Sequence, residues 1–80
     1  MFEEVERSVS RERLVKQIRE ILSEREFTII CLRYALKGGV PLAQREVANI
    51  LKISRSYISR IEKHAVEKLR MRLRAEDFLD

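Results

Sequence analysis

Apolar residues recur at helical spacing through the first quarter of the chain. Leu14, Ile18 and Ile21 are separated by four and three positions, so they fall on one face of a helix. Charged residues occupy most of the positions between them. The pattern predicts a helix over about residues 9–22, preceded by a frayed segment at residues 1–8.

A second helix is predicted from Ser23 to about Leu36. Ser23 and Glu26 have the Ser-x-x-Glu spacing of a capping box, in which each side chain accepts a hydrogen bond from the other residue's backbone N–H. Gly38 or Gly39 can adopt the positive φ that ends a helix. The apolar stripe expected to face the core comprises Phe27, Ile30, Cys31 and Tyr34.

Beyond the only proline, the pattern predicts two helices joined by a tight turn. The first covers about residues 43–51 and the second about residues 54–73, with Lys52 in the turn and Ser54 as the N-cap of the second helix. The last residues, 75–80, form an acidic tail. The inward-facing positions are Val47, Ala48, Leu51, Ile58, Ile61, Ala65 and Leu69.

These elements predict a single all-α domain over residues 1–80. It is a small bundle of about four helices, with two helices in residues 9–36 and a C-terminal, winged-helix-like helix-turn-helix in residues 43–73. No apolar run reaches the length of a membrane span, and the acidic start is unlike a signal peptide, so a cytoplasmic protein is expected. Cys31 is the only cysteine, which excludes a disulfide framework and a cysteine-based metal site.

Positive charge is concentrated in the second half of the chain. The formal net charge is +4, but the segment from Lys52 to Arg74 carries eight Lys or Arg and two acids, a local balance of +6. Clustered cations indicate a polyanionic partner, for which nucleic acid is the default. The alternative from charge alone is a solvated basic helix.

The predicted helix-turn-helix leaves the first turns of its second helix free to meet DNA. A helix of this kind fits the major groove, where Arg pairs with guanine and Ser donates or accepts hydrogen bonds. The residues expected on this face are Arg55, Ser56, Ser59, Arg60 and Lys63.

Five segments of the chain resemble region 4 of the bacterial sigma-70 family. The stretches 44–48 (QREVA), 53–62 (ISRSYISRIE) and 68–70 (KLR) resemble its helix-turn-helix, and 22–26 (LSERE) and 32–36 (LRYAL) resemble the preceding subregion. Within this family, the five segments are most similar to the sporulation sigma factors of the sigma-E, sigma-F, sigma-G and sigma-K type. The resemblance covers about two thirds of the chain.

The resemblance implies a role in transcription initiation. Region 4 binds the promoter −35 element as double-stranded DNA and docks on the β flap of RNA polymerase core. Positions on the recognition helix, Arg55, Ser56, Ser59 and Arg60, match contacts to bases and phosphates. The other matching positions are Tyr57 and His64 near the backbone, Gln44 and Arg45 at phosphates, and Ile29, Leu32 and Leu36 as candidates for flap docking.

Three residues depart from the family pattern. Ala43 stands where a Thr N-cap is usual, Ala35 stands where Gly is usual, and Lys52 occupies a turn position often held by Gly or Asn. The chain is also too short to hold the domain with which sigma factors melt the −10 region. It is therefore expected to be a fragment, or a stand-alone region 4-like regulator.

Two other interpretations of the sequence remain open. One is a different helix-turn-helix regulator, such as a dimeric response-regulator effector domain; another is a module that docks on polymerase or an anti-sigma factor without useful DNA affinity. No catalytic set, cofactor motif or metal site is visible, so binding and not catalysis is expected. The resemblance to region 4 implies that the chain binds a single site as a monomer. Glu62 is expected to be solvated or paired within its helix, His64 exposed, and Cys31 in the core, while Tyr57 either packs or contacts a phosphate.

Overall fold

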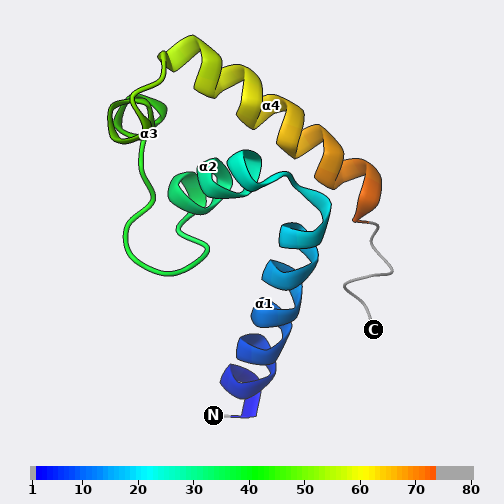
Figure 1. Ribbon diagram of the computed structural model, residues 1–80. Helices are drawn as coiled ribbons and strands as arrows, with labels where there is room; N and C mark the ends of the chain where they lie inside the picture. The colour runs from blue at the N-terminus through cyan, green and yellow to red at the C-terminus, as the bar shows by residue number, and fades with distance from the viewer. Residues whose placement is uncertain (1, 74–80) are drawn as a thin grey trace.

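The computed structural model describes the backbone of residues 2–73 and the side chains of residues 11–73. Four helices, α1 (Phe2–Ile21), α2 (Glu24–Tyr34), α3 (Gln44–Leu51) and α4 (Arg55–Arg72), follow one another with no strand in the described range (Figure 1). The predicted all-α architecture is confirmed. The predicted acidic tail, residues 75–80, lies outside the described residues.

Two helix boundaries differ from the prediction. The helix expected from about residue 9 begins at Phe2, so the segment expected to be frayed is helical from that residue onward. The second helix ends at Tyr34 and not near Leu36, because Ala35 adopts a left-handed conformation with φ of 53° and closes the helix. Gly38 and Gly39 do have positive φ, but they lie in the loop beyond the helix end.

The predicted N-caps of α2 and α4 are confirmed. At α2, the Ser23 amide donates to Glu26 Oε1 over 2.8 Å, and the Glu26 amide donates to Ser23 Oγ over 3.2 Å. At α4, Ser54 Oγ accepts from the Tyr57 amide over 3.2 Å. Each contact satisfies backbone donors that a helix start leaves unpaired, and so fixes where these helices begin.

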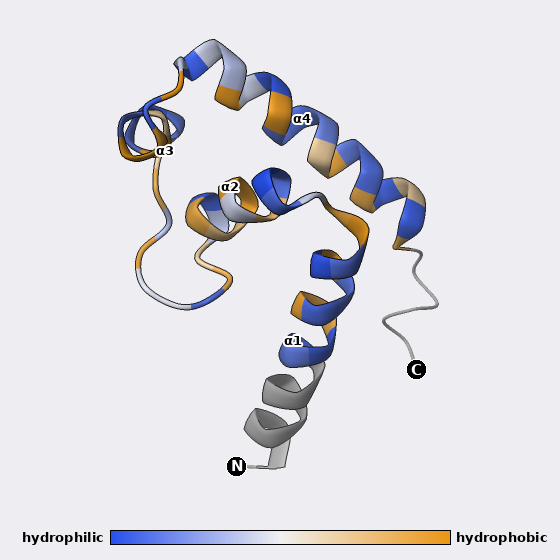
Figure 2. Cartoon of the chain, in the orientation of Figure 1, coloured by the Kyte–Doolittle hydropathy of each residue, from blue (hydrophilic) through white to orange (hydrophobic). Residues whose placement is uncertain are grey.

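Among the described side chains, the core consists of two clusters that share α2 and α4. One cluster joins α1, α2 and α4 through Ile18, Leu22, Phe27, Ile30 and Ala65. The other joins α2, α3 and α4 through Ile29, Val47, Ala48 and Ile58. Figure 2 shows the apolar faces turned toward the space between the helices. Because α2 contributes to both clusters, it connects the N-terminal helix to the helix-turn-helix.

The N-terminus of α3 has only half of a capping box. Glu46 Oε1 accepts from the Ala43 amide over 2.9 Å, but Ala43 has no side-chain acceptor to return the bond. Ala43 is exposed and already has the extended conformation of an N-cap, with φ of −72° and ψ of 159°. We therefore expect Ala43→Thr to raise the free energy of unfolding by about 0.5–2 kcal/mol. Thermal denaturation would measure the gain, and Ala43→Val, which adds bulk without an acceptor, is the control.

Lys52 ends α3 in the left-handed region, with φ of 57° and its side chain exposed. A residue with a Cβ is strained there by about 1–2 kcal/mol, whereas glycine is not. After the entropy cost of glycine, we expect Lys52→Gly to stabilise the fold by about 0.5–1 kcal/mol in urea denaturation. Lys52→Ala removes the same charge and keeps the strain. An equal gain from Lys52→Ala would show that charge, and not backbone strain, is responsible.

Candidate nucleic-acid interface

Helices α3 and α4 form the predicted helix-turn-helix. Val47 and Ala48 on α3 pack against Ile58 on α4, and Val47 and Ile58 are fully buried. Within the turn, the Ile53 amide donates to the Ala48 carbonyl over 3.0 Å. Fully buried Ile29 of α2 completes this cluster. The inward face of α4 is thus occupied by its neighbours, and its outward face is left to solvent.

The outward face of α4 carries the side chains predicted to meet DNA. Tyr57 is 43% exposed, which excludes full burial against the helix pair, and His64 is exposed as expected. The residues on this face that were predicted to contact DNA are all exposed, and they are here called the reading face: Arg55, Ser56, Ser59, Arg60 and Lys63. The predicted role requires this exposure.

A groove of about 600 Å³ runs beside the reading face, between α4 and the start of α2. Arg60, Lys63 and His64 line it from α4, and exposed Arg25 lines it from α2. Arg25 adds a cation to this side of the molecule that the sequence analysis did not identify. The only sequence signal for it was a basic residue in the first turn of the second helix, which says nothing of its nearness to α4.

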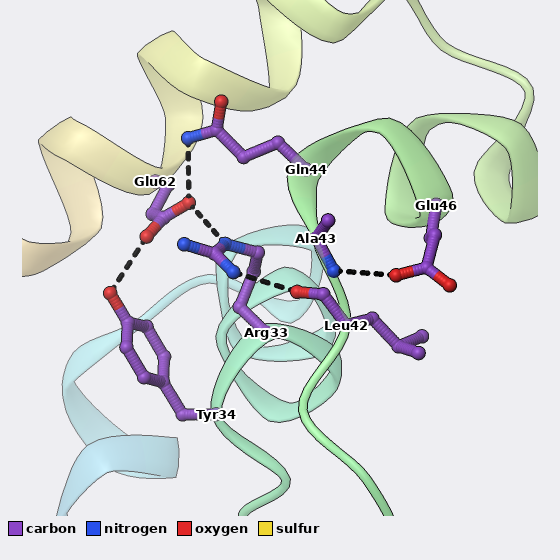
Figure 3. A network of polar contacts seen from close by, with 7 residues as sticks. All are labelled: Arg33, Tyr34, Leu42, Ala43, Gln44, Glu46 and Glu62. Carbon is purple, nitrogen blue, oxygen red and sulfur yellow. Dashed lines mark hydrogen bonds and ion pairs between the residues drawn. The ribbon is translucent and has the colours of Figure 1, made fainter.

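A polar network holds α2, α3 and α4 together (Figure 3). One oxygen of Glu62, Oε1, accepts from Arg33 Nε over 2.8 Å and from Gln44 Nε2 over 3.0 Å, and the other, Oε2, accepts from the Tyr34 hydroxyl over 2.7 Å. Arg33 Nη1 also donates to the Leu42 carbonyl over 2.7 Å, just before α3. One carboxylate on the recognition helix is therefore bonded to both helices that support it.

Two site predictions change because of this network. Glu62 is 7% exposed and bonded across three helices, so the expectation of a solvated or intrahelical pair was wrong. The Gln44 side chain, expected at a phosphate, is half-buried and donates to Glu62. Neither partnership was visible in the sequence, because the partners of Glu62 lie 18, 28 and 29 positions away along the chain.

Burial and hydrogen bonding act in opposite directions on Glu62. Burial by itself raises the pKa of the carboxyl group, but hydrogen bonds from Arg33, Gln44 and Tyr34, with the charge of Arg33, outweigh it and hold the pKa below its ordinary 4.5. Glu26 behaves in the same way: burial opposes the hydrogen bonds from Lys68 and the Ser23 backbone, and its pKa is also lowered. Both carboxylates are stabilised as anions by the fold.

These pKa values predict that acid weakens the fold. Since both groups have a folded pKa below 4.5, their contribution is complete above that pH and is lost as pH falls through the folded pKa. We expect the free energy of unfolding, measured with urea, to fall as the pH is lowered from about 5 through 4.5 and toward the folded pKa values. Glu62→Gln should show a shallower decline over the same interval. Parallel curves for the two proteins would contradict the assignment to Glu62.

The surface predicted for flap docking needs a correction. Ile29 is fully buried in the core of the helix-turn-helix and is not available to a partner. Leu32 and Leu36 are half-buried and pack against different clusters: Leu32 against the cluster that contains Ile29, and Leu36 against the cluster that contains Phe27. The three residues therefore do not form one surface. Cys31 packs against the first cluster, as expected, and burial raises the pKa of its thiol.

Most of the basic residues of α4 are not paired within the described part of the chain. The Lys68 ammonium lies 2.7 Å from Glu26 Oε1, and this is the one ion pair in the described residues that involves a cation of α4.

None of the described helices has the length and apolar character needed to cross a bilayer. Nor do three His, Cys, Asp or Glu side chains gather anywhere in the described residues as a metal site requires.

Comparison with known proteins agrees with this arrangement. A family model described as "Sigma-70, region 4" matches residues 20–71. The chain is 51% identical over 49 residues to the RNA polymerase sigma-E factor of Clostridium acetobutylicum, covering 61% of this chain and 21% of that protein. It is 49% identical over 55 residues to the RNA polymerase sigma-K factor of Bacillus subtilis, covering 69% and 19%. No solved structure gives a significant match.

The match also covers the structural elements described above. Residues 20–71 run from the end of α1 through almost all of α4, so they include the helix-turn-helix, the second core cluster and every buried residue of the first except Ile18. The resemblance to the sigma-E and sigma-K type is confirmed. The chain spans about a fifth of the length of the curated relatives it matches. The chain belongs to the sigma-70 region 4 family.

Proposed function

We propose that this chain binds the −35 element of promoters as the region 4 domain of an RNA polymerase sigma factor, and so directs transcription initiation. The observation that carries the proposal is the reading face, a set of exposed basic and hydroxyl side chains on the first turns of α4. The opposite side of α4 is packed into the buried core of the helix-turn-helix. An α-helix presented in this way fits the major groove. The mechanism is binding, with no catalytic step.

Phosphate contacts and base contacts have separate roles in this proposal. Arg45 is exposed at the start of α3, and Arg25 and His64 lie along the groove beside α4; these side chains contact the phosphates and fix the register. Gln44 contributes through its backbone N–H at the helix start, because its side chain is bonded to Glu62. Arg55 and the serines of the reading face meet base edges.

RNA polymerase core is the proposed protein partner, since a sigma region 4 acts while attached to the polymerase. The proposed setting is the bacterial cytoplasm at the nucleoid, where the isolated domain binds one site as a monomer. An anti-sigma factor is a further proposed partner. A dimeric helix-turn-helix regulator would instead bind paired half-sites, and sedimentation of the free and DNA-bound chain separates the two.

Fluorescence anisotropy on a duplex that contains a −35 element and on a scrambled duplex tests the proposal. We expect tighter binding to the promoter duplex than to the scrambled duplex. The logarithm of the binding constant should fall linearly with the logarithm of the salt concentration, with a slope of several units. Equal, salt-sensitive binding to both duplexes would reduce the reading face to a non-specific basic patch. Absence of binding at low salt would favour a role in protein docking alone.

A further inference from the structure

The first turn of α3 is the part of the helix-turn-helix that the apolar core holds least. Residues 44–46 include no buried residue, and the buried positions of α3 begin at Val47. The turn that joins α3 to α4 lies at the other end of α3, where the Ile53 amide donates to the Ala48 carbonyl. On its other side, the chain reaches α3 through a long loop (Figure 1). The position of the start of α3 therefore depends on contacts outside the turn and the buried core.

The last turn of α2 provides such contacts. The Leu42 amide donates to the Leu32 carbonyl over 3.1 Å, and Arg33 Nη1 donates to the Leu42 carbonyl over 2.7 Å. The Leu42 side chain also packs against the second core cluster. Both polar groups of the Leu42 backbone, two residues ahead of α3, are therefore bonded to α2.

Arg33 joins this segment to the recognition helix. Figure 3 shows its guanidinium between the Leu42 carbonyl and Glu62 of α4, to which Arg33 Nε donates over 2.8 Å. Arg33 Cζ also lies 5.4 Å from the centroid of the Tyr34 ring, and the Tyr34 hydroxyl donates to the second oxygen of Glu62. The planar guanidinium offers several N–H groups in fixed directions, which the single ammonium of a lysine cannot reproduce. Arg33 thus sets the distance between α4 and the segment that enters α3.

Gln44 makes a second link between the start of α3 and α4. Its side chain donates to Glu62 Oε1 over 3.0 Å, so the first residue of α3 is bonded directly to the recognition helix. Exposed Arg45 follows it in the chain. The two groups proposed to meet phosphates on α3, the Gln44 backbone N–H and the Arg45 side chain, therefore lie on a helix start that is tied to α4.

We propose that Arg33 and the side chain of Gln44 are positioning residues for DNA recognition, which act through Glu62. They hold the phosphate-binding start of α3 in register with the reading face of α4, and Arg33 acts through these bonds and not through a contact with DNA. This inference rests on the proposed function, because the register of α3 and α4 matters only to a partner that contacts both. Phosphate contacts orient a protein on the duplex, so a displaced α3 weakens recognition even when α4 is unchanged.

A double-mutant cycle on the affinity of the full chain for the −35 duplex tests the proposal. Arg33→Lys keeps the charge beside Glu62 but removes the planar donors, and should weaken binding at least about fivefold at a temperature where the variant is folded. Arg45→Gln should weaken binding about five- to tenfold in the unaltered chain, but less than about twofold in Arg33→Lys, because the phosphate contact is already displaced. Arg60→Gln, on α4, should weaken binding by the same factor in both backgrounds.

Hydrogen exchange of the free chain gives a readout that does not depend on DNA. The Leu42 amide, bonded to α2, reports on the segment that enters α3, and the Ala65 amide, in the middle of α4, reports on the recognition helix. We expect Arg33→Lys and Gln44→Met to reduce the protection of Leu42 at least about fivefold more than that of Ala65. Arg13→Lys makes the same substitution at an exposed position of α1 and should change neither the affinity nor the exchange.

The results separate this proposal from the proposed function. Additive losses from Arg33→Lys and Arg45→Gln, or an equal loss of protection at Leu42 and Ala65, overturn the positioning role and assign the two links to overall stability alone. Equal affinity of the unaltered chain for promoter and scrambled duplexes, with the coupling and the exchange pattern as expected, refutes the proposed function and supports the positioning role. Absence of DNA binding by the unaltered chain refutes both.

Discussion

Glu62→Gln is expected to lower the free energy of unfolding by about 3 kcal/mol. The substitution keeps the size of the side chain but removes the charge that Arg33 faces at 2.8 Å, and it replaces one acceptor oxygen with a donor. Arg33 retains 24% side-chain exposure, so part of its charge stays solvated and the loss falls at the lower end of that for a buried pair. For a domain of this size the melting temperature should fall by roughly 12–24 °C.

Glu67→Gln is the matched control for this prediction. It removes the same charge from the same helix, but Glu67 is exposed. We expect its effect on stability to stay within about 0.5 kcal/mol. Equal destabilisation by the two substitutions, measured by urea denaturation at neutral pH, would mean that the net charge of α4 matters and that the network in Figure 3 does not.

Local signals predicted the helices well where side chains act on their own backbone. The capping box of Ser23 and Glu26 and the N-cap of Ser54 involve residues three positions apart, so the sequence alone contains both partners. The end of α2 was harder to predict. Two glycines were available for the helix end, yet the chain uses Ala35, and the family pattern, which favours Gly at that position, was the only sign of it.

Contacts between helices were the part that the sequence did not reveal. Glu62 bonds to residues 18 to 29 positions away, and no periodicity in α4 distinguishes it from a surface acid. Ile29 was misassigned for a related reason. Helix α2 packs against both core clusters, so it buries two faces. A prediction with one apolar stripe on this helix treats the second buried face, which carries Ile29, as exposed surface. The reading face was predictable because it is the side of α4 that neither cluster uses.

Arg55→Ala is expected to weaken binding to the promoter duplex by about 1–3 kcal/mol and to relax specificity at one base pair. Arg55 is the first residue of α4, it is exposed, and no described acid forms an ion pair with it. The first turn of a recognition helix reaches base edges, where the guanidinium can donate two parallel hydrogen bonds to guanine. Binding to a set of duplexes, each with one −35 base pair changed, measures both effects.

Arg72→Ala is the control, because Arg72 is an exposed cation at the opposite end of the same helix. Removing the Arg72 side chain should lower the affinity only slightly and by the same factor on every duplex, because it changes only the overall charge of the protein. If Arg55→Ala weakens binding equally on all duplexes and reduces the salt dependence by about one unit, Arg55 contacts a phosphate. Base recognition would then depend on the remaining residues of the reading face, of which Arg60 is the one with a guanidinium and Ser56 and Ser59 offer hydroxyl groups.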